Sequence, residues 1–137
     1  MASTSINCSC GAIEIQLSGQ PMAQYFCHCD DCQAVHGGAF AVSLYKSDRV
    51  TVTRGKTIDF SLKTTPRTKC PGCGTFLFAE VPGYGVRGVS ASLLPAGQFK
   101  PQFHLQCQFA IRPVDDSLPH FKHLPSDFGG SGELMPW

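Results

Sequence analysis

The sequence has little net charge and no long apolar run. Its 137 residues include 11 Lys and Arg and 10 Asp and Glu, for a formal net charge of +1. Without an excess of basic residues, the chain lacks the electrostatic character of a protein that binds nucleic acid or an anionic membrane surface. No stretch approaches the roughly 18 apolar residues that a membrane-spanning helix needs. We therefore expect neither a nucleic-acid partner nor a membrane partner.

An export signal and amphipathic helices are also missing. Residues 1–7 lack the apolar stretch of a signal peptide, so we expect a soluble, cytoplasmic protein. No window of ten or more residues repeats its apolar positions every three or four residues, as an amphipathic helix does. Only residues 30–36 suggest a short helical turn.

The sequence does contain short segments in which apolar and polar residues alternate. They cover residues 13–17, 40–44, 50–52 and 58–62, and most clearly 103–111. A period of two is that of half-buried strands. Fourteen glycines and ten prolines lie between the segments, as the turns of an antiparallel protein require. The pattern predicts a mainly β protein, a single compact domain over residues 1–137 with a loosely ordered tail over 126–137.

Eight cysteines are the strongest chemical signal in the chain. A disulfide scaffold is typical of smaller, secreted chains, whereas a chain of this length can bury a core of its own. Metal binding is therefore the preferred explanation. Seven cysteines fall in three short motifs, Cys8-Ser-Cys10, Cys27-His-Cys29-Asp-Asp-Cys32 and Cys70-Pro-Gly-Cys73, and Cys107 stands alone.

The arrangement of these motifs predicts two different zinc sites. Structural zinc takes four ligands in a tetrahedron, and glycines beside the cysteines allow tight turns around the metal. Joining the two pairs gives a closed site with the ligands Cys8, Cys10, Cys70 and Cys73. The triplet then supplies the three ligands Cys27, Cys29 and Cys32. Three protein ligands with an exchangeable fourth position are typical of catalytic zinc.

Two alternatives stay open at this level. Cys107 could complete the triplet and make both sites structural, although its apolar neighbours suit a buried free thiol. The Cys-x-x-Cys spacing also suits a redox pair, but the βαβ context of such pairs is missing.

At these motifs the chain resembles the glutathione-dependent formaldehyde-activating enzyme family, also called the GFA or CENP-V/GFA domain. The resemblance rests on Cys8-Ser-Cys-Gly11, Cys27-His-Cys-Asp-Asp-Cys-Gln33 and Cys70-Pro-Gly-Cys-Gly-Thr75, and continues into Pro-Gln-Phe-His104 and Leu118-Pro-His-Phe121. The motif-bearing core thus spans about residues 6–125. The resemblance implies an Mss4-like fold of several coiled antiparallel sheets, with one structural and one catalytic zinc at the ligands above. It also implies carbon–sulfur chemistry on glutathione adducts, nominally S-hydroxymethylglutathione.

We therefore expect a zinc-dependent carbon–sulfur lyase or thiol-adduct enzyme, in which a zinc-held thiolate is the nucleophile or the leaving group. A zinc held by three thiolates suits the exchange of one soft ligand for another. The expected catalytic residues are Cys27, Cys29 and Cys32, with His28 and His36 as acid–base candidates. His104 is a further candidate, placed by the alternation on the polar face of its strand, which is either a pocket or solvent-exposed.

The expected partner is a small-molecule thiol adduct derived from glutathione, whose binding site should supply cations. Glutathione carries two carboxylates, and the candidate cations for them are Lys46, Arg67, Lys69 and Arg87. The alternative to an enzyme is a non-catalytic binding module stabilised by two structural zinc ions. The oligomeric state does not follow from the sequence.

Overall fold

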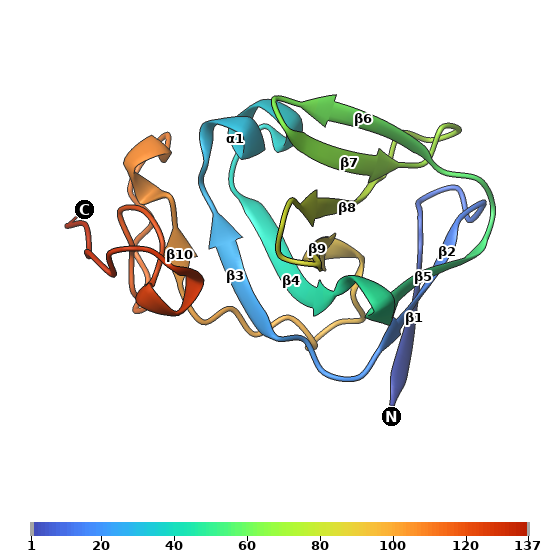
Figure 1. The fold of residues 1–137 in the computed structure, drawn as a ribbon, viewed down its shortest axis with the longest axis horizontal. Helices are drawn as coiled ribbons and strands as arrows, with labels where there is room; N and C mark the ends of the chain where they lie inside the picture. Colours follow the sequence, from blue (N-terminus) through green and yellow to red (C-terminus); the bar gives the residue numbers. More distant parts are fainter. Residues whose placement is uncertain (1, 137) are drawn as a thin grey trace. The chain divides into compact units, whose positions relative to one another are not determined.

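The computed structural model describes residues 2–136 and confirms the mainly β class. Ten strands and one α-helix occur in this part of the chain. The strands form two sheets, with the orders β1-β2-β5 and β10-β3-β4-β9-β8-β7-β6 (Figure 1). By its internal contacts the chain divides into two compact units. The first unit comprises Met1–Ala23 with Ser43–Phe99, and the second comprises Gln24–Val42 with Lys100–Trp137. The single domain stays a prediction.

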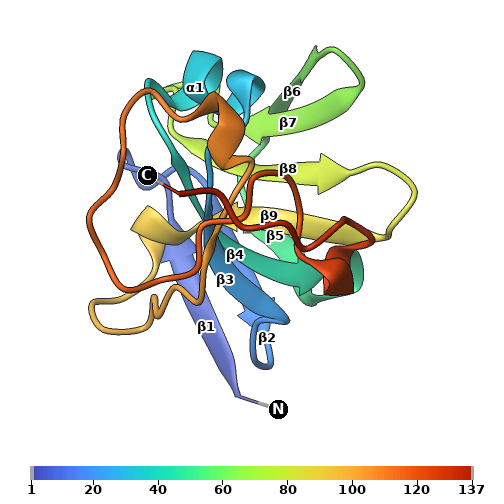
Figure 2. The same cartoon turned by 90° about the vertical axis from the view of Figure 1, so that its left-hand side faces the viewer.

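The first unit contains seven strands, and the alternation predicts three of them, β2, β5 and β6. The seven are β1 (Ser3–Asn7), β2 (Glu14–Ser18), β5 (Val50–Arg54), β6 (Ile58–Leu62), β7 (Thr65–Lys69), β8 (Phe76–Val81) and β9 (Val86–Ser90). β4 (Phe40–Lys46) begins in the second unit and ends in the first. β6, β7, β8 and β9 pair antiparallel in that order. Figure 2 shows β8 returning as β9 through a turn at residues 82–85.

The core of the first unit includes two cysteines of the predicted closed site. In β2, Ile15 and Leu17 are buried while the residues between them are half-buried, as a strand with one face on a core requires. Cys8 and Cys70 belong to the same buried cluster. The short turns η1 (Ser47–Arg49) and η2 (Ala91–Leu93) complete this unit.

The second unit is built on a parallel pair of strands and a short helix. Its elements are β3 (Ala23–Cys27), apart from Ala23, and α1 (Asp30–His36), β10 (His104–Leu105), η3 (Cys107–Phe109) and η4 (Ser126–Phe128). The helix confirms the predicted turn over residues 30–36. Tyr25 and Phe103 stack with ring centroids 5.4 Å apart, and Phe128 meets Tyr25 edge-on at 5.6 Å.

The long strand predicted over residues 103–111 is wrong. β10 covers only two residues, because Gln106 has a φ of 55°, a left-handed conformation that ends an extended strand. The chain then turns as η3, where the N–H of Cys107 bonds the carbonyl of Phe121 at 3.0 Å. Ile111, at the far end of the alternation, is 73% exposed.

The tail from residue 126 pairs with the segment before it. The N–H of Met135 bonds the carbonyl of His120 at 2.8 Å, and the N–H of Lys122 bonds the carbonyl of Glu133 at 2.9 Å. Loose order in this tail stays a prediction. Across residues 2–136, no helix has the length and apolar character needed to span a bilayer.

Candidate metal centres

Four thiols of the first unit converge as the paired motifs predict. Cys8 follows β1 and Cys70 follows β7, and the ligand atoms of Cys8, Cys10, Cys70 and Cys73 all lie within 4.8 Å of one another. The Sγ atom of Cys10 lies 3.6 Å from that of Cys8 and 3.8 Å from that of Cys70. Thiolates bound about 2.3 Å from a tetrahedral zinc lie about 3.8 Å apart. The four thiols therefore fit a closed zinc site.

Glycine turns hold these thiols in place. Gly11 and Gly74, each just after the second cysteine of a pair, have φ values of 79° and 75°, which glycine adopts without steric cost. The N–H of Ile13 donates to Sγ of Cys8 at 3.3 Å. Backbone donors of this kind stabilise a thiolate.

The ionisation of these thiols also favours a bound cation. Hydrogen bonds from the Thr75 hydroxyl and backbone lower the pKa of Cys73 to about 5. For Cys10, the backbone of Ala12 acts to lower the pKa, but the neighbouring thiols outweigh it and raise the pKa to about 11. The clustered thiols thus do not all ionise by themselves, and a divalent cation removes that obstacle.

The triplet lies where a strand meets a helix in the second unit. β3 ends at Cys27, and Cys29 is the N-cap of α1. The Sγ atom of Cys29 accepts the N–H of Cys32 at 3.1 Å. Clustering with the thiols of Cys29 and Cys32 raises the pKa of Cys27 well above its usual value. As at the first site, a cation is needed to make all three thiolates.

The triplet sulfurs fit one metal less closely than the four-cysteine set. Sγ of Cys32 lies 3.4 Å from Sγ of Cys27 and 2.6 Å from Sγ of Cys29. The first distance is near that expected for two zinc ligands and the second is shorter. The side chain of Cys29 or Cys32 must therefore turn outward by about 1 Å when the metal binds. The donor set itself, three soft thiolates, suits zinc.

Cys107 stands apart from both groups of thiols. It is 1% exposed, and burial, together with the charge of Asp116, raises the pKa of its thiol to about 11. Among residues 2–136, the thiols that lie within ligand distance of one another at the triplet are Cys27, Cys29 and Cys32. This geometry favours Cys107 as a buried free thiol.

The two histidine candidates near the triplet have different surroundings. Nε2 of His28 lies 2.8 Å from Nδ1 of His104, and burial, with the charge of His104, lowers the pKa of His28 to about 4. His36 lies one helical turn after Cys32 and stacks on Phe40 with ring centroids 4.1 Å apart. Gln33 donates to the carbonyl of His28 at 3.3 Å.

Sequence reasoning left His104 facing either a pocket or solvent, and it missed the partner of this side chain. His104 is 2% exposed, so its side chain is not on a solvated face. Its Nε2 lies 2.7 Å from Oδ2 of Asp116, and Nε2 of His120 lies 3.3 Å from Oδ1 of the same carboxylate. His104, Asp116 and His120 are a third group whose ligand atoms lie within 4.8 Å of one another. Local spacing gave no sign of a contact between residues 28 and 104.

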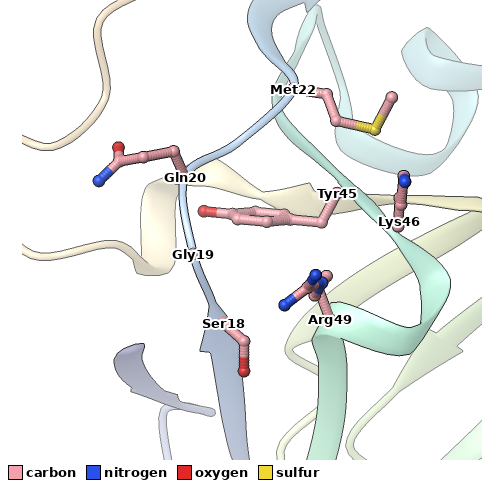
Figure 3. A pocket seen from close by; sticks show the side chains of 7 residues that line it. All are labelled: Ser18, Gly19, Gln20, Met22, Tyr45, Lys46 and Arg49. Atoms are coloured by element: carbon pink, nitrogen blue, oxygen red, sulfur yellow. The ribbon is translucent and has the colours of Figure 1, made fainter. Parts of the chain in front are cut away.

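The four side chains expected to bind the carboxylates of glutathione all lie in the first unit, and their contacts differ. Arg87 donates to Glu80 at 2.5 Å and to the carbonyl of Val50 at 2.9 Å. The Lys69 ammonium lies 5.4 Å from the ring centroid of Phe60. Lys46 lines a pocket of about 190 Å³. Figure 3 shows its lining residues, with the Tyr45 ring across it: Ser18, Gly19, Gln20, Met22, Tyr45, Lys46 and Arg49.

Arg67 is the exceptional cation of this unit. It lies on β7 and is 4% exposed. Within residues 2–136, its buried Nε and Nη1 atoms have no hydrogen-bond partner. Burying a guanidinium with two unbonded nitrogens destabilises the folded state, so we expect Arg67 to lower the free energy of unfolding.

We expect Arg67→Met to leave the free energy of unfolding unchanged or to raise it, because methionine fills the space without a buried charge. The matched control is Arg87→Met, which removes a bonded guanidinium and should cost about 1.5–3 kcal/mol. Denaturant unfolding of both variants makes the comparison. If Arg67→Met is the less stable of the two, then other interactions offset the cost of burying the Arg67 guanidinium, and the expectation is wrong.

The fold and its cysteines define a mainly β protein with clusters of thiols that could hold metal ions. The family model described as glutathione-dependent formaldehyde-activating enzyme matches residues 3–109. The chain belongs to this family, the GFA family, as its motifs predicted, and the family is named for an enzyme.

A solved structure agrees with the fold. The chain is similar to a crystal structure of a Rhodobacter sphaeroides protein, with 21% identity and a TM-score of 0.54. The match covers 67% of this chain and 88% of that one. None of the curated proteins matches the chain.

Proposed function

We propose that this protein is a zinc-dependent lyase that makes or breaks the carbon–sulfur bond of a glutathione-derived adduct, such as S-hydroxymethylglutathione. The observation that carries the proposal is the triplet of thiols at the junction of β3 and α1. Cys27, Cys29 and Cys32 would hold the ion and leave a position for the substrate sulfur. A zinc ion bound there would lower the pKa of the substrate thiol and favour its thiolate.

The four-cysteine set has the complementary role in this proposal. Its thiols belong partly to the buried core, and around one zinc ion they would complete a tetrahedron with no position left for substrate. We assign it a structural zinc. The number of ions is then two per chain, one structural and one catalytic.

The residues beside the triplet would handle the proton of the adduct. When the carbon–sulfur bond of a hydroxymethyl adduct breaks, its electron pair stays on sulfur, the hydroxyl proton goes to a base, and formaldehyde leaves. We propose His28 and His36 for this base. His28 is adjacent in sequence to two of the three proposed ligands, and His36 lies one helical turn from the third.

The metal content gives a first test. We expect about two zinc ions per chain in protein kept reduced and zinc-replete, one of which a chromogenic chelator removes much faster. An open position lets the chelator enter, whereas four thiolates exclude it. Metal analysis before and after timed chelation measures both numbers. Two equally slow ions would instead favour the binding module with two structural zincs.

The activity itself is tested by a screen of thiol adducts. Zinc-loaded protein is mixed with formaldehyde and glutathione, cysteine or no thiol, and adduct formation and decay are followed by NMR. Faster exchange with glutathione than with cysteine supports the proposal. Rates equal to those without protein, for every thiol, reject it.

A further inference from the structure

Hydrogen bonds connect the triplet to a carboxylate that is not among the proposed ligands. Nε2 of His28 lies 2.8 Å from Nδ1 of His104, and Nε2 of His104 lies 2.7 Å from Oδ2 of Asp116. We call these three side chains the histidine series. His28 and His104 are 4% and 2% exposed, so water competes little for these bonds. Asp116 lies beyond residue 109, where the match to the family model ends.

The carboxylate sets the direction of the series. Burial acts to raise the pKa of Asp116, but the hydrogen bond from His104 and the N–H of Leu118 lower it below its usual value. An ionised carboxylate only accepts hydrogen bonds, so Nε2 of His104 carries the proton. With that proton on Nε2, the Nδ1 of His104 is the nitrogen that can accept, and Nε2 of His28 is the donor in the 2.8 Å bond. Asp116 thereby fixes the tautomer of both rings.

The backbone holds His104 rigidly at the middle of the series. Its N–H bonds the carbonyl of Pro119 at 2.8 Å, and its carbonyl accepts the N–H of Phe121 at 2.9 Å. The next residue, Leu105, accepts the N–H of His28 at 3.0 Å and pairs with Cys27 in the parallel ladder. The segment that carries Cys27 and His28 is therefore tied to β10 by both main chain and side chain.

We propose that Asp116 and His104 are positioning residues, which hold the Cys27–Cys29 segment through His28 in the conformation that places three thiolates on one metal ion. The inference rests on the proposed function, because it takes the triplet as a metal site. Groups that orient metal ligands commonly change the metal affinity by 10- to 100-fold when they are removed.

A metal bound directly by His104, Asp116 and His120 is a different explanation of the same cluster. These groups lie within 4.8 Å of one another, and two imidazoles with a carboxylate are suitable ligands. However, the 2.7 and 2.8 Å bonds engage both ring nitrogens of His104. A metal at Nε2 would have to displace the carboxylate from its hydrogen bond, so the geometry favours the hydrogen-bonded series.

The test uses Asp116→Asn in the full, zinc-loaded chain. We expect 10- to 100-fold weaker binding of the labile metal, measured by chelator competition, while the slowly removed metal is unaffected. In cobalt-loaded protein the thiolate-to-cobalt absorption of the labile site should weaken or shift. Asp116→Glu, which keeps the carboxylate, should recover part of the affinity.

The matched control is His120→Gln. It removes a histidine that contacts the other oxygen of Asp116 but lies outside the path to His28, so the labile metal should stay within threefold of wild type. Equal losses in His120→Gln and Asp116→Asn would overturn the proposal, since the cluster would then act only through general stability. Loss of a third metal ion in Asp116→Asn would overturn it in favour of a direct metal site.

A second variant keeps the proposal testable if Asp116→Asn does not fold. His28→Phe keeps a ring and cuts the series at its other end, and it should weaken the same metal. Unchanged metal affinity in whichever of the two variants folds rejects the inference. These readouts need no turnover, so a wild-type protein with no activity on thiol adducts would reject the proposed function and leave this inference standing.

Discussion

Cys70→Ser will remove the cooperative unfolding transition of the protein. Cys70 is 1% exposed and lies in the core of the first unit. Its sulfur lies beside that of Cys10, a neighbour 60 positions away in the sequence, so a metal here joins two distant parts of the chain. Structural zinc contributes on the order of 10 kcal/mol in small domains, comparable to a total stability of about 5–15 kcal/mol. Circular dichroism and a thermal melt measure the loss.

Cys107→Ser is the matched control for this variant. It makes the same chemical change at an equally buried cysteine that lies outside both proposed metal sites. Burying a hydroxyl there should cost about 1–3 kcal/mol and leave a cooperative melt. If Cys70→Ser melts at the same temperature as Cys107→Ser, the four-cysteine site carries no special share of the stability and the assignment of a structural zinc fails.

Patterns within a few neighbouring residues predicted the elements whose burial or spacing is visible in the sequence itself. The alternation in β2 and β4 located strands whose apolar residues are buried. The short helix after Cys29 was also predicted, as the one segment that suggested a helical turn. Spacing alone also grouped the paired cysteines. The motifs contain two pairs and one triplet, so joining the two pairs is the one way to build a four-ligand site from pairs.

Elements that depend on cross-strand partners escaped prediction. β7, with the sequence Thr-Pro-Arg-Thr-Lys, has no apolar alternation and is a strand because β6 and β8 pair with it on both sides. The opposite error occurred at residues 103–111. Alternation continues there past Gln106, but the left-handed conformation of this residue turns the chain toward Phe121 and His123.

The histidine series shows why a site is harder to predict than its ligands. Cysteine motifs are local, since several ligands lie within a few residues. The bond between His28 and His104 joins positions 76 apart, and a single histidine has no spacing in the sequence that marks its partner. Such contacts depend on strand order, here on β10 lying parallel to β3.

Cys29→Ser should remove one zinc and the activity while the fold stays nearly intact. The triplet spans residues 27–32 only, and closing so short a loop costs little entropy, so its metal adds little to global stability. Serine is a poor zinc ligand at neutral pH. It is also a good N-cap, so its hydroxyl can replace Sγ of Cys29 as the acceptor for the N–H of Cys32 and preserve the start of α1.

Cys29→Ala separates the two roles of this side chain. Alanine loses the metal ligand and the cap together, and should cost about 1 kcal/mol more than serine. Melting temperature and metal content are measured side by side for both variants and for Cys70→Ser. We expect one zinc in each Cys29 variant and a melting temperature within a few degrees of wild type for Cys29→Ser. If Cys29→Ser loses its folded structure as completely as Cys70→Ser, the triplet is a structural site as well. The zinc then has no open position for a substrate, and the non-catalytic binding module replaces the lyase as the explanation.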